Sequence, residues 1–97
     1  MSDRVALPSS VPLELHRQFR FQWEAKQDCF VLLYPEGMVK LPGSAGEIMK
    51  RVDGTRSVDE IVEDLEASFP GTDLRADVIE FLEIAHGKGW IRSKEDR

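Results

Sequence analysis

Cysteine, histidine and long apolar runs are scarce in this chain, and each shortage excludes a class of protein. Cys29 is the single cysteine, so no internal disulfide can form. It lies in the apolar run of residues 29–33, where we expect a small buried side chain in a protein of a reducing compartment. No stretch approaches the roughly 18–20 apolar residues of a membrane-spanning helix, and residues 1–12 lack the apolar core of a signal peptide. We therefore expect a cytoplasmic protein with no membrane partner.

Recognisable catalytic and cofactor motifs are also missing. The sequence contains no phosphate-binding loop, dinucleotide fingerprint, EF-hand loop or metal-binding cysteine cluster. His16 lies in a segment without periodicity, and His86 falls at the end of a predicted helix, where the helix dipole favours a cation. Carboxylates four residues apart, such as Asp59 and Glu63, are more simply explained by a solvated helix face than by a metal site. We predict no catalytic residues, no cofactor and no metal.

Positive charge is the third shortage. The chain has 18 acidic and 13 basic residues and a formal net charge of -5. Between residues 57 and 83 the only base is Arg75, and the acids are Asp59, Glu60, Glu63, Asp64, Glu66, Asp73, Asp77, Glu80 and Glu83. Binding to nucleic acid depends on Lys and Arg that displace counterions from phosphate. The sequence therefore argues against a nucleic-acid partner, whereas a peptide or protein with basic segments would be attracted.

The length of 97 residues fits one small domain with short ends. Residues 1–18 include Pro8 and Pro12 and show no sustained periodicity, which is typical of a flexible N-terminal arm. Leu13 and Leu15 are the expected points of contact between this arm and the domain. We assign residues 19–92 to the domain itself and residues 93–97 to a C-terminal tail.

Three short strands are predicted at the start of the domain. Residues 19–24 alternate between apolar and polar side chains, as in a half-buried strand, and residues 29–34 are continuously apolar, as in a central strand. Pro35 and Gly37 then favour a turn into a short third strand, residues 38–41, which ends at Pro42. We expect this third strand at an edge of the sheet.

Three helices are predicted to follow. Two pairs match the capping box, Ser44 with Glu47 and Ser57 with Glu60. In this motif the Ser oxygen accepts from a helical N–H, and the Glu side chain accepts from the backbone N–H of the Ser. The predicted helices end near residues 52, 69 and 86, and the third begins near residue 72 or 73. This order predicts an α+β, winged-helix-like fold, a three-stranded antiparallel sheet followed by three helices.

The third predicted helix has a wider apolar arc, about 220°, than one core contact requires. Its main stripe consists of Leu74, Val78, Phe81, Leu82 and Ala85, with Ile79 and Ile84 at the flanks. Two interpretations stay open. The helix is either buried between neighbours or has one edge that lines a groove.

A series of short motifs runs along the chain in a characteristic order. They are Leu32-Leu33-Tyr34-Pro35-Glu36-Gly37, Ser44-Ala45, Asp53-Gly54-Thr55-Arg56-Ser57, Glu60-Ile61-Val62, Phe69-Pro70-Gly71, Asp77-Val78, Phe81-Leu82 and Gly89-Trp90. Together they resemble the PqqD family of pyrroloquinoline quinone (PQQ) biosynthesis, over about residues 11–91. Pro42-Gly43 and Arg51-Val52 depart from the residues more common in that family.

The resemblance implies a peptide chaperone, related to the leader-recognition domains of ribosomally made peptide natural products. Such a protein is a non-catalytic adaptor that binds the precursor peptide PqqA and presents it to PqqE, a radical S-adenosylmethionine enzyme that cross-links a Glu and a Tyr of the peptide. The cofactor chemistry would then belong to the partner. The alternative for the same order of elements is a winged-helix DNA-binding regulator, which the acidic helices disfavour.

The predicted mechanism is β-augmentation, in which an extended peptide adds a strand to the edge formed by residues 38–41. The predicted peptide-binding residues are Met38, Val39, Lys40 and Leu41 on this strand and Leu74, Val78, Phe81, Leu82 and Ala85 on the third helix. Core packing is the alternative for each of these residues. The same open edge allows a homodimer by strand exchange or edge pairing. Residues 19–92 are accordingly predicted to be a single winged-helix-like peptide-binding domain.

Overall fold

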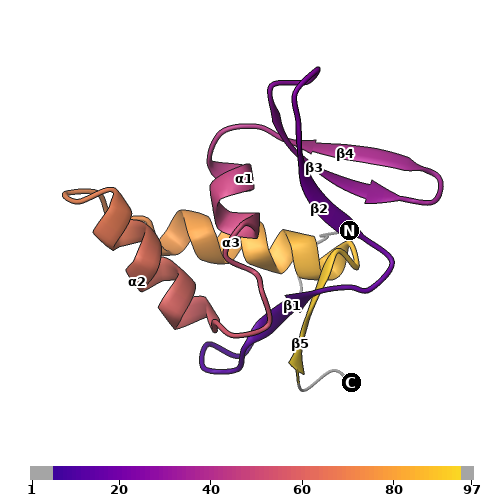
Figure 1. Ribbon diagram of the computed structural model, residues 1–97. Coiled ribbons are helices and arrows are strands. Elements are labelled where there is room, and N and C mark those ends of the chain that lie inside the picture. Colours follow the sequence, from indigo (N-terminus) through magenta and orange to yellow (C-terminus); the bar gives the residue numbers. More distant parts are fainter. Residues whose placement is uncertain (1–5, 95–97) are drawn as a thin grey trace.

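The computed structural model describes residues 6–94 of the chain, and Figure 1 shows how its elements are arranged. In chain order the elements are β1 (Leu13–Leu15), β2 (Arg20–Glu24), β3 (Cys29–Tyr34), β4 (Gly37–Leu41), α1 (Ser44–Met49), α2 (Val58–Ser68), α3 (Arg75–Gly87) and β5 (Ile91–Ser93). The predicted α+β fold, a three-stranded antiparallel sheet followed by three helices, is confirmed. A second, two-stranded sheet made of β1 and β5 was not predicted.

The three-stranded sheet has the order β2-β3-β4, so the continuously apolar strand β3 is central, as predicted. One face carries an aromatic group in which the rings of Phe21 and Phe30 stack at a centroid distance of 4.7 Å. Helix α1 packs on this face through Gly46, where a Cβ atom would lie 2.8 Å from the carbonyl oxygen of Leu41. A side chain at Gly46 would therefore separate α1 from the sheet.

The two-stranded sheet corrects the prediction of a flexible arm. Leu13 has no exposed surface, and its backbone N–H donates to the carbonyl of Arg56 at 2.9 Å. Strand β1 pairs antiparallel with β5, and Leu13 is opposite Ser93. Ser93, which was assigned to a C-terminal tail, is likewise buried. Backbone pairing with the far end of the chain orders this part of the arm, whereas residues 1–5 and 95–97 lie outside the described range.

The two predicted capping boxes have different outcomes. At α2 the Ser57 hydroxyl accepts from the N–H of Glu60 at 3.3 Å, and Glu60 accepts from the N–H of Ser57 at 2.9 Å, so this box is confirmed. At α1 the prediction is wrong. Ser44 is the first residue inside the helix, the cap position is Gly43 with φ of 59°, and no side chain caps the helix.

Helix α3 begins at Arg75, two or three residues later than predicted. Between α2 and α3 the chain turns at Gly71, which has a positive φ of 88°. The N–H of Leu74 then donates to the Glu66 carboxylate of α2 at 3.0 Å. A side chain from a neighbouring helix thus satisfies a backbone donor that a local cap would otherwise satisfy. No helix within residues 6–94 is long and apolar enough to cross a membrane.

Candidate functional site

Strand β4 has one edge without a strand partner among residues 6–94, because the sheet order ends with it. Its turn from β3 has two residues, and Tyr34 is opposite Gly37. In such a hairpin, the pair next to the turn is hydrogen-bonded and the bonding then alternates along the strands. The N–H groups of Met38 and Lys40 therefore point toward the open edge, whereas that of Val39 points toward β3. The open edge is able to pair with another extended chain.

The predicted strand residues lie on both faces of the sheet. Val39 is half-buried and Leu41 is buried, and they share a face with the core. Met38, which is 39% exposed, and Lys40 are on the opposite, outward face. An added strand beside β4 would accordingly place alternate side chains over the helices and over the outer face of the sheet.

The predicted helix residues separate into two groups. Leu74, Val78 and Phe81 line a pocket at the start of α3, although Val78 is only 2% exposed and also belongs to the core. Leu82 and Ala85 have no exposed surface and do not line this pocket. For these two residues the structure favours core packing, the alternative that the sequence left open, because the helix is covered on that side by the rest of the domain.

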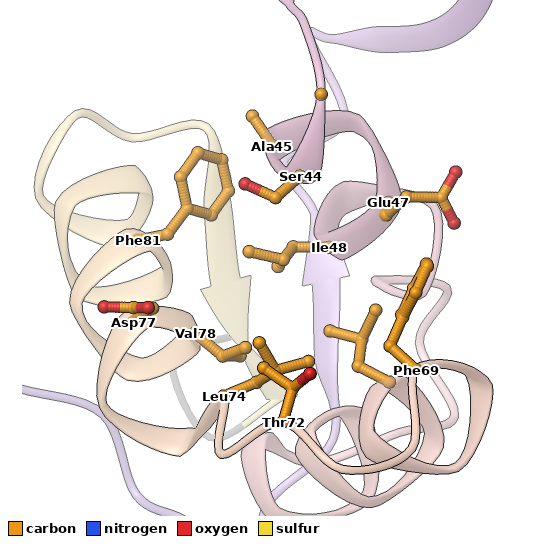
Figure 2. Close-up of a pocket in the computed structure, with 12 residues that line it drawn as sticks. Ser44, Ala45, Glu47, Ile48, Phe69, Thr72, Leu74, Asp77, Val78 and Phe81 are labelled. Atoms are coloured by element: carbon orange, nitrogen blue, oxygen red, sulfur yellow. The ribbon is translucent and has the colours of Figure 1, made fainter.

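The pocket has a volume of about 660 Å³ and lies between α1, α2 and the first half of α3, as Figure 2 shows. Its lining residues are Gly43, Ser44, Ala45, Glu47, Ile48, Leu65, Phe69, Thr72, Leu74, Asp77, Val78 and Phe81. Ile48 from α1 and Phe81 from α3 point toward one another across it (Figure 2). The pocket begins where β4 ends, because Pro42 alone separates Leu41 from the first lining residue, Gly43.

The walls contributed by α1 and α2 were missed in the sequence. Ala45, Ile48 and Leu65 follow ordinary helical periodicity, so their pattern does not distinguish pocket from core. Phe69 carried a usable signal, because a large aromatic residue stands at the end of an amphipathic helix directly before Pro70-Gly71. Its side chain is 47% exposed in the structure. Such exposure of an aromatic ring beside a pocket is typical of a binding surface.

Arg51 fixes the position of α1 against α2. Its guanidinium group bonds to the Asp64 carboxylate, to the Glu47 carbonyl oxygen at 2.8 Å and to the Ser68 hydroxyl at 3.3 Å. Burial lowers the pKa of Arg51, but the hydrogen bonds to Asp64 and Glu47 outweigh this effect and the pKa is raised. Arg51 therefore stays charged and connects two walls of the pocket.

Acidic groups dominate the charge around the pocket. Glu47 and Asp77 are the charged residues among those that line it. Glu47 pairs with Arg51 at 3.1 Å, whereas Asp77 is exposed in the first turn of α3. Within residues 6–94, no three His, Cys, Asp or Glu side chains gather closely enough to hold a metal ion.

These features define a small α+β binding domain with an open strand edge and an apolar pocket that begins two residues after that strand. Comparison with known proteins identifies the family of this domain. The family model described as "Coenzyme PQQ synthesis protein D (PqqD)" matches residues 29–91, and the chain belongs to this family.

Curated relatives and solved structures agree with this assignment. A "PqqA binding protein" of Pseudomonas aeruginosa (strain UCBPP-PA14) is 57% identical over 90 residues, which cover 90% of this chain and 97% of the relative. The solution NMR structure of the PqqD truncation of Methylobacterium extorquens PqqCD, described as a functional and stand-alone RiPP recognition element, has a TM-score of 0.74 at 26% identity and covers 95% of this chain and 99% of that one. The crystal structure of PqqD from Xanthomonas campestris has a TM-score of 0.53 at 33% identity, with 91% of each chain covered.

Proposed function

We propose that this protein binds the precursor peptide PqqA as an added strand along the open edge of β4. The observation that carries the proposal is the outward direction of the Met38 and Lys40 N–H groups next to a pocket that starts at Gly43. Main-chain hydrogen bonds along an edge give affinity, and pockets for alternate side chains give specificity. The name of the Pseudomonas aeruginosa relative, "PqqA binding protein", supports the choice of peptide.

The protein acts in this proposal as an adaptor that presents the bound peptide to the radical S-adenosylmethionine enzyme PqqE. Its own part is to bind the peptide and order it, and the partner supplies the chemistry. An extended peptide loses conformational freedom when it joins a sheet edge. An enzyme that receives the peptide already ordered has less of this loss to overcome, which is a physical reason for a separate binding domain.

The experiment that tests the proposal is a titration of ¹⁵N-labelled protein with PqqA. We expect amide shifts to concentrate in β4 and around Leu74–Phe81, because these residues flank the added strand. The other edge of the sheet, at β2, likewise has no strand partner within residues 6–94. It serves as an internal control, and its amide signals should not shift. The largest shifts on β2, or no saturable shifts at all, would contradict the proposal.

A substitution at Lys40 tests the strand pairing itself. Lys40→Pro removes a backbone donor that points toward the open edge and leaves the bonds between Val39 and β3 in place. We expect PqqA binding to weaken about tenfold, which is the loss of one hydrogen bond together with the misfit of the ring. Lys40→Ala is the matched control, because it removes the side chain but keeps the N–H. Equal losses in both variants would assign the effect to the side chain rather than to strand pairing.

The open edge also permits two copies of the chain to pair, and the homodimer stays a prediction. Edge pairing between copies would compete with the peptide for the same N–H groups. Sedimentation at increasing protein concentration, with and without PqqA, measures this competition. We expect any dimer to dissociate as peptide is added, and a dimer that persists at saturating peptide would assign its contact to another surface.

A further inference from the structure

The pocket between α1, α2 and α3 has exposed apolar surface that the pairing of a peptide strand with β4 does not need. Phe69 is 47% exposed, and Ala45 and Phe81 are half-buried, although all three line the pocket. In Figure 2, Phe81 lies close to Ala45 on one side and Phe69 lies below Glu47 on the other. Two aromatic rings thus flank an opening with a floor of aliphatic side chains. A bulky apolar group placed between them would lose most of its contact with water.

The charged residues at the rim of the pocket indicate the charge of the group that would lie next to that apolar group. None of the lining residues is basic. Glu47 is compensated by Arg51, but Asp77 makes no ion pair with any residue between 6 and 94. Asp77 lies at the rim on the α3 side (Figure 2). Exposed carboxylates of α2 and α3, such as Glu63 and Glu80, add to the negative potential. A cation beside the apolar group is therefore favoured over an anion.

We propose that this pocket anchors the bound peptide through one bulky apolar side chain, and that Asp77 pairs with a Lys or Arg located within two positions of it. The inference rests on the proposed peptide binding and specifies which peptides the site accepts. The connection between the two parts of the site is short, because the pocket starts two residues after the end of β4. A peptide that pairs with β4 reaches the pocket by continuing past Leu41. Asp77 is then a specificity-determining residue, and the anchor sets the register of the added strand.

The test combines variants of the protein with variants of PqqA. In the protein, Asp77→Asn removes the charge at the rim, and Glu63→Gln is its control, an exposed carboxylate of α2 that does not line the pocket. Ala45→Leu fills the pocket, and Ala67→Leu adds the same bulk at an exposed position outside it. Phe69→Ala is a second pocket variant that leaves the core intact. In the peptide, each Lys and Arg and each bulky apolar residue is replaced singly by Ala. Affinities are measured by fluorescence anisotropy, and circular dichroism checks the fold of each variant.

We expect Asp77→Asn to weaken PqqA binding about two- to fivefold at low salt, the range for a partly exposed charge pair, and less at high salt. The effect should vanish with the one peptide variant that lacks the paired base. Ala45→Leu should weaken binding about tenfold and Phe69→Ala about fivefold. Glu63→Gln and Ala67→Leu should leave the affinity unchanged.

The ¹³C-methyl signals of Ile48, Leu65 and Val78 distinguish failure of this inference from failure of the proposed function. If PqqA shifts the β4 amides but leaves these methyl groups unchanged, the peptide binds and the pocket anchor is wrong. If no basic residue of the peptide couples to Asp77, the charge pairing is wrong. If neither amides nor methyl groups respond, the proposed function itself fails and this inference fails with it. Methyl shifts that grow with protein concentration without peptide would assign the pocket to a second copy of the chain and overturn the proposal.

Discussion

Arg92 Nε donates to Glu14 Oε2 at 2.7 Å, although the two residues stand at opposite ends of the chain. The pair lies across β5 and β1, where Glu14 is directly opposite Arg92. The same segment is held by backbone bonds, including Gly54 N–H to the Leu13 carbonyl at 2.8 Å and Lys94 N–H to the Pro12 carbonyl at 3.0 Å. Strand β1 is thus joined both to the loop before α2 and to the C-terminal segment of the described chain. Strand β1 and this segment cover the side of the core that the three-stranded sheet does not reach (Figure 1).

Leu13→Ala should destabilise the whole domain, because Leu13 is fully buried in the main core. We expect the free energy of unfolding to fall by about 2–5 kcal/mol, the usual cost of Leu→Ala in a core. Urea unfolding followed by circular dichroism measures the difference. Arg17→Ala, at an exposed position of the same predicted arm, should change it by no more than about 0.5 kcal/mol. Equal, small effects at both positions would restore the prediction of a flexible arm.

Ser57→Ala and Ser44→Ala should differ in their effect on stability, although the two sequence motifs look alike. Ser57 caps α2 and is buried, so its replacement should reduce the free energy of unfolding by about 0.5–2 kcal/mol. Ser44 is exposed inside the first turn of α1 and caps nothing, so Ala is expected to be neutral there. Denaturant unfolding of the two variants provides the comparison. A loss at Ser44 that matches the loss at Ser57 would mean that α1 begins differently in solution.

Asp53 should make stability depend on pH. The Thr55 hydroxyl donates to Asp53 Oδ1 at 2.6 Å and is the largest cause of a lowered pKa. Burial opposes this effect, and the Thr55 N–H and the charge of Arg56 lower the pKa of Asp53 further. A carboxylate with a lower pKa in the folded state stabilises the protein above its unfolded pKa of about 3.9, and this contribution is lost as the pH falls through the folded value.

Asp53→Ala is therefore expected to reduce the free energy of unfolding at neutral pH, by less than about 1 kcal/mol because the carboxylate is well solvated. The difference from the unsubstituted protein should narrow as the pH falls below about 4. Thr55→Val, which removes the donor hydroxyl, should flatten the same pH dependence. Unfolding curves at several pH values test both statements, and a difference that stays constant between neutral and acidic pH would contradict them.

DNA binding is the remaining alternative for a winged-helix-like arrangement, and we expect it to be absent. Along α2 and α3 the one Arg, Arg75, pairs with Asp59 at 3.0 Å, so it is not available to phosphate without breaking that pair. A gel-shift assay with a random duplex at about 0.1 M salt should show no retardation, with PqqA binding by the same sample as the activity control. Tight binding with a steep salt dependence would favour the regulator over the adaptor.

Parts of the site were predictable because they depend on short segments. The turn at Pro35 and Gly37 and the Pro42 stop indicated a short third strand, and the structure places this strand, β4, at the sheet edge. Leu74, Val78 and Phe81 followed from the broad apolar arc of the third helix. The arc did not separate these pocket residues from Leu82 and Ala85, because burial depends on which neighbours cover a helix and not on the helix itself. The α1 wall was missed for the same reason.

The sequence by itself determined the local elements, the central position of β3, the cap at Ser57 and the acidic character of the helices. Each depends on residues that are close together along the chain, where periodicity, turn chemistry and charge act directly. Only the tertiary structure decided that Leu13 belongs to the core, that Glu66 satisfies the start of α3, and that α1, α2 and α3 enclose a pocket next to β4. These features come from contacts between distant segments. Their energies depend on how the folded elements meet, and a local pattern does not encode that arrangement.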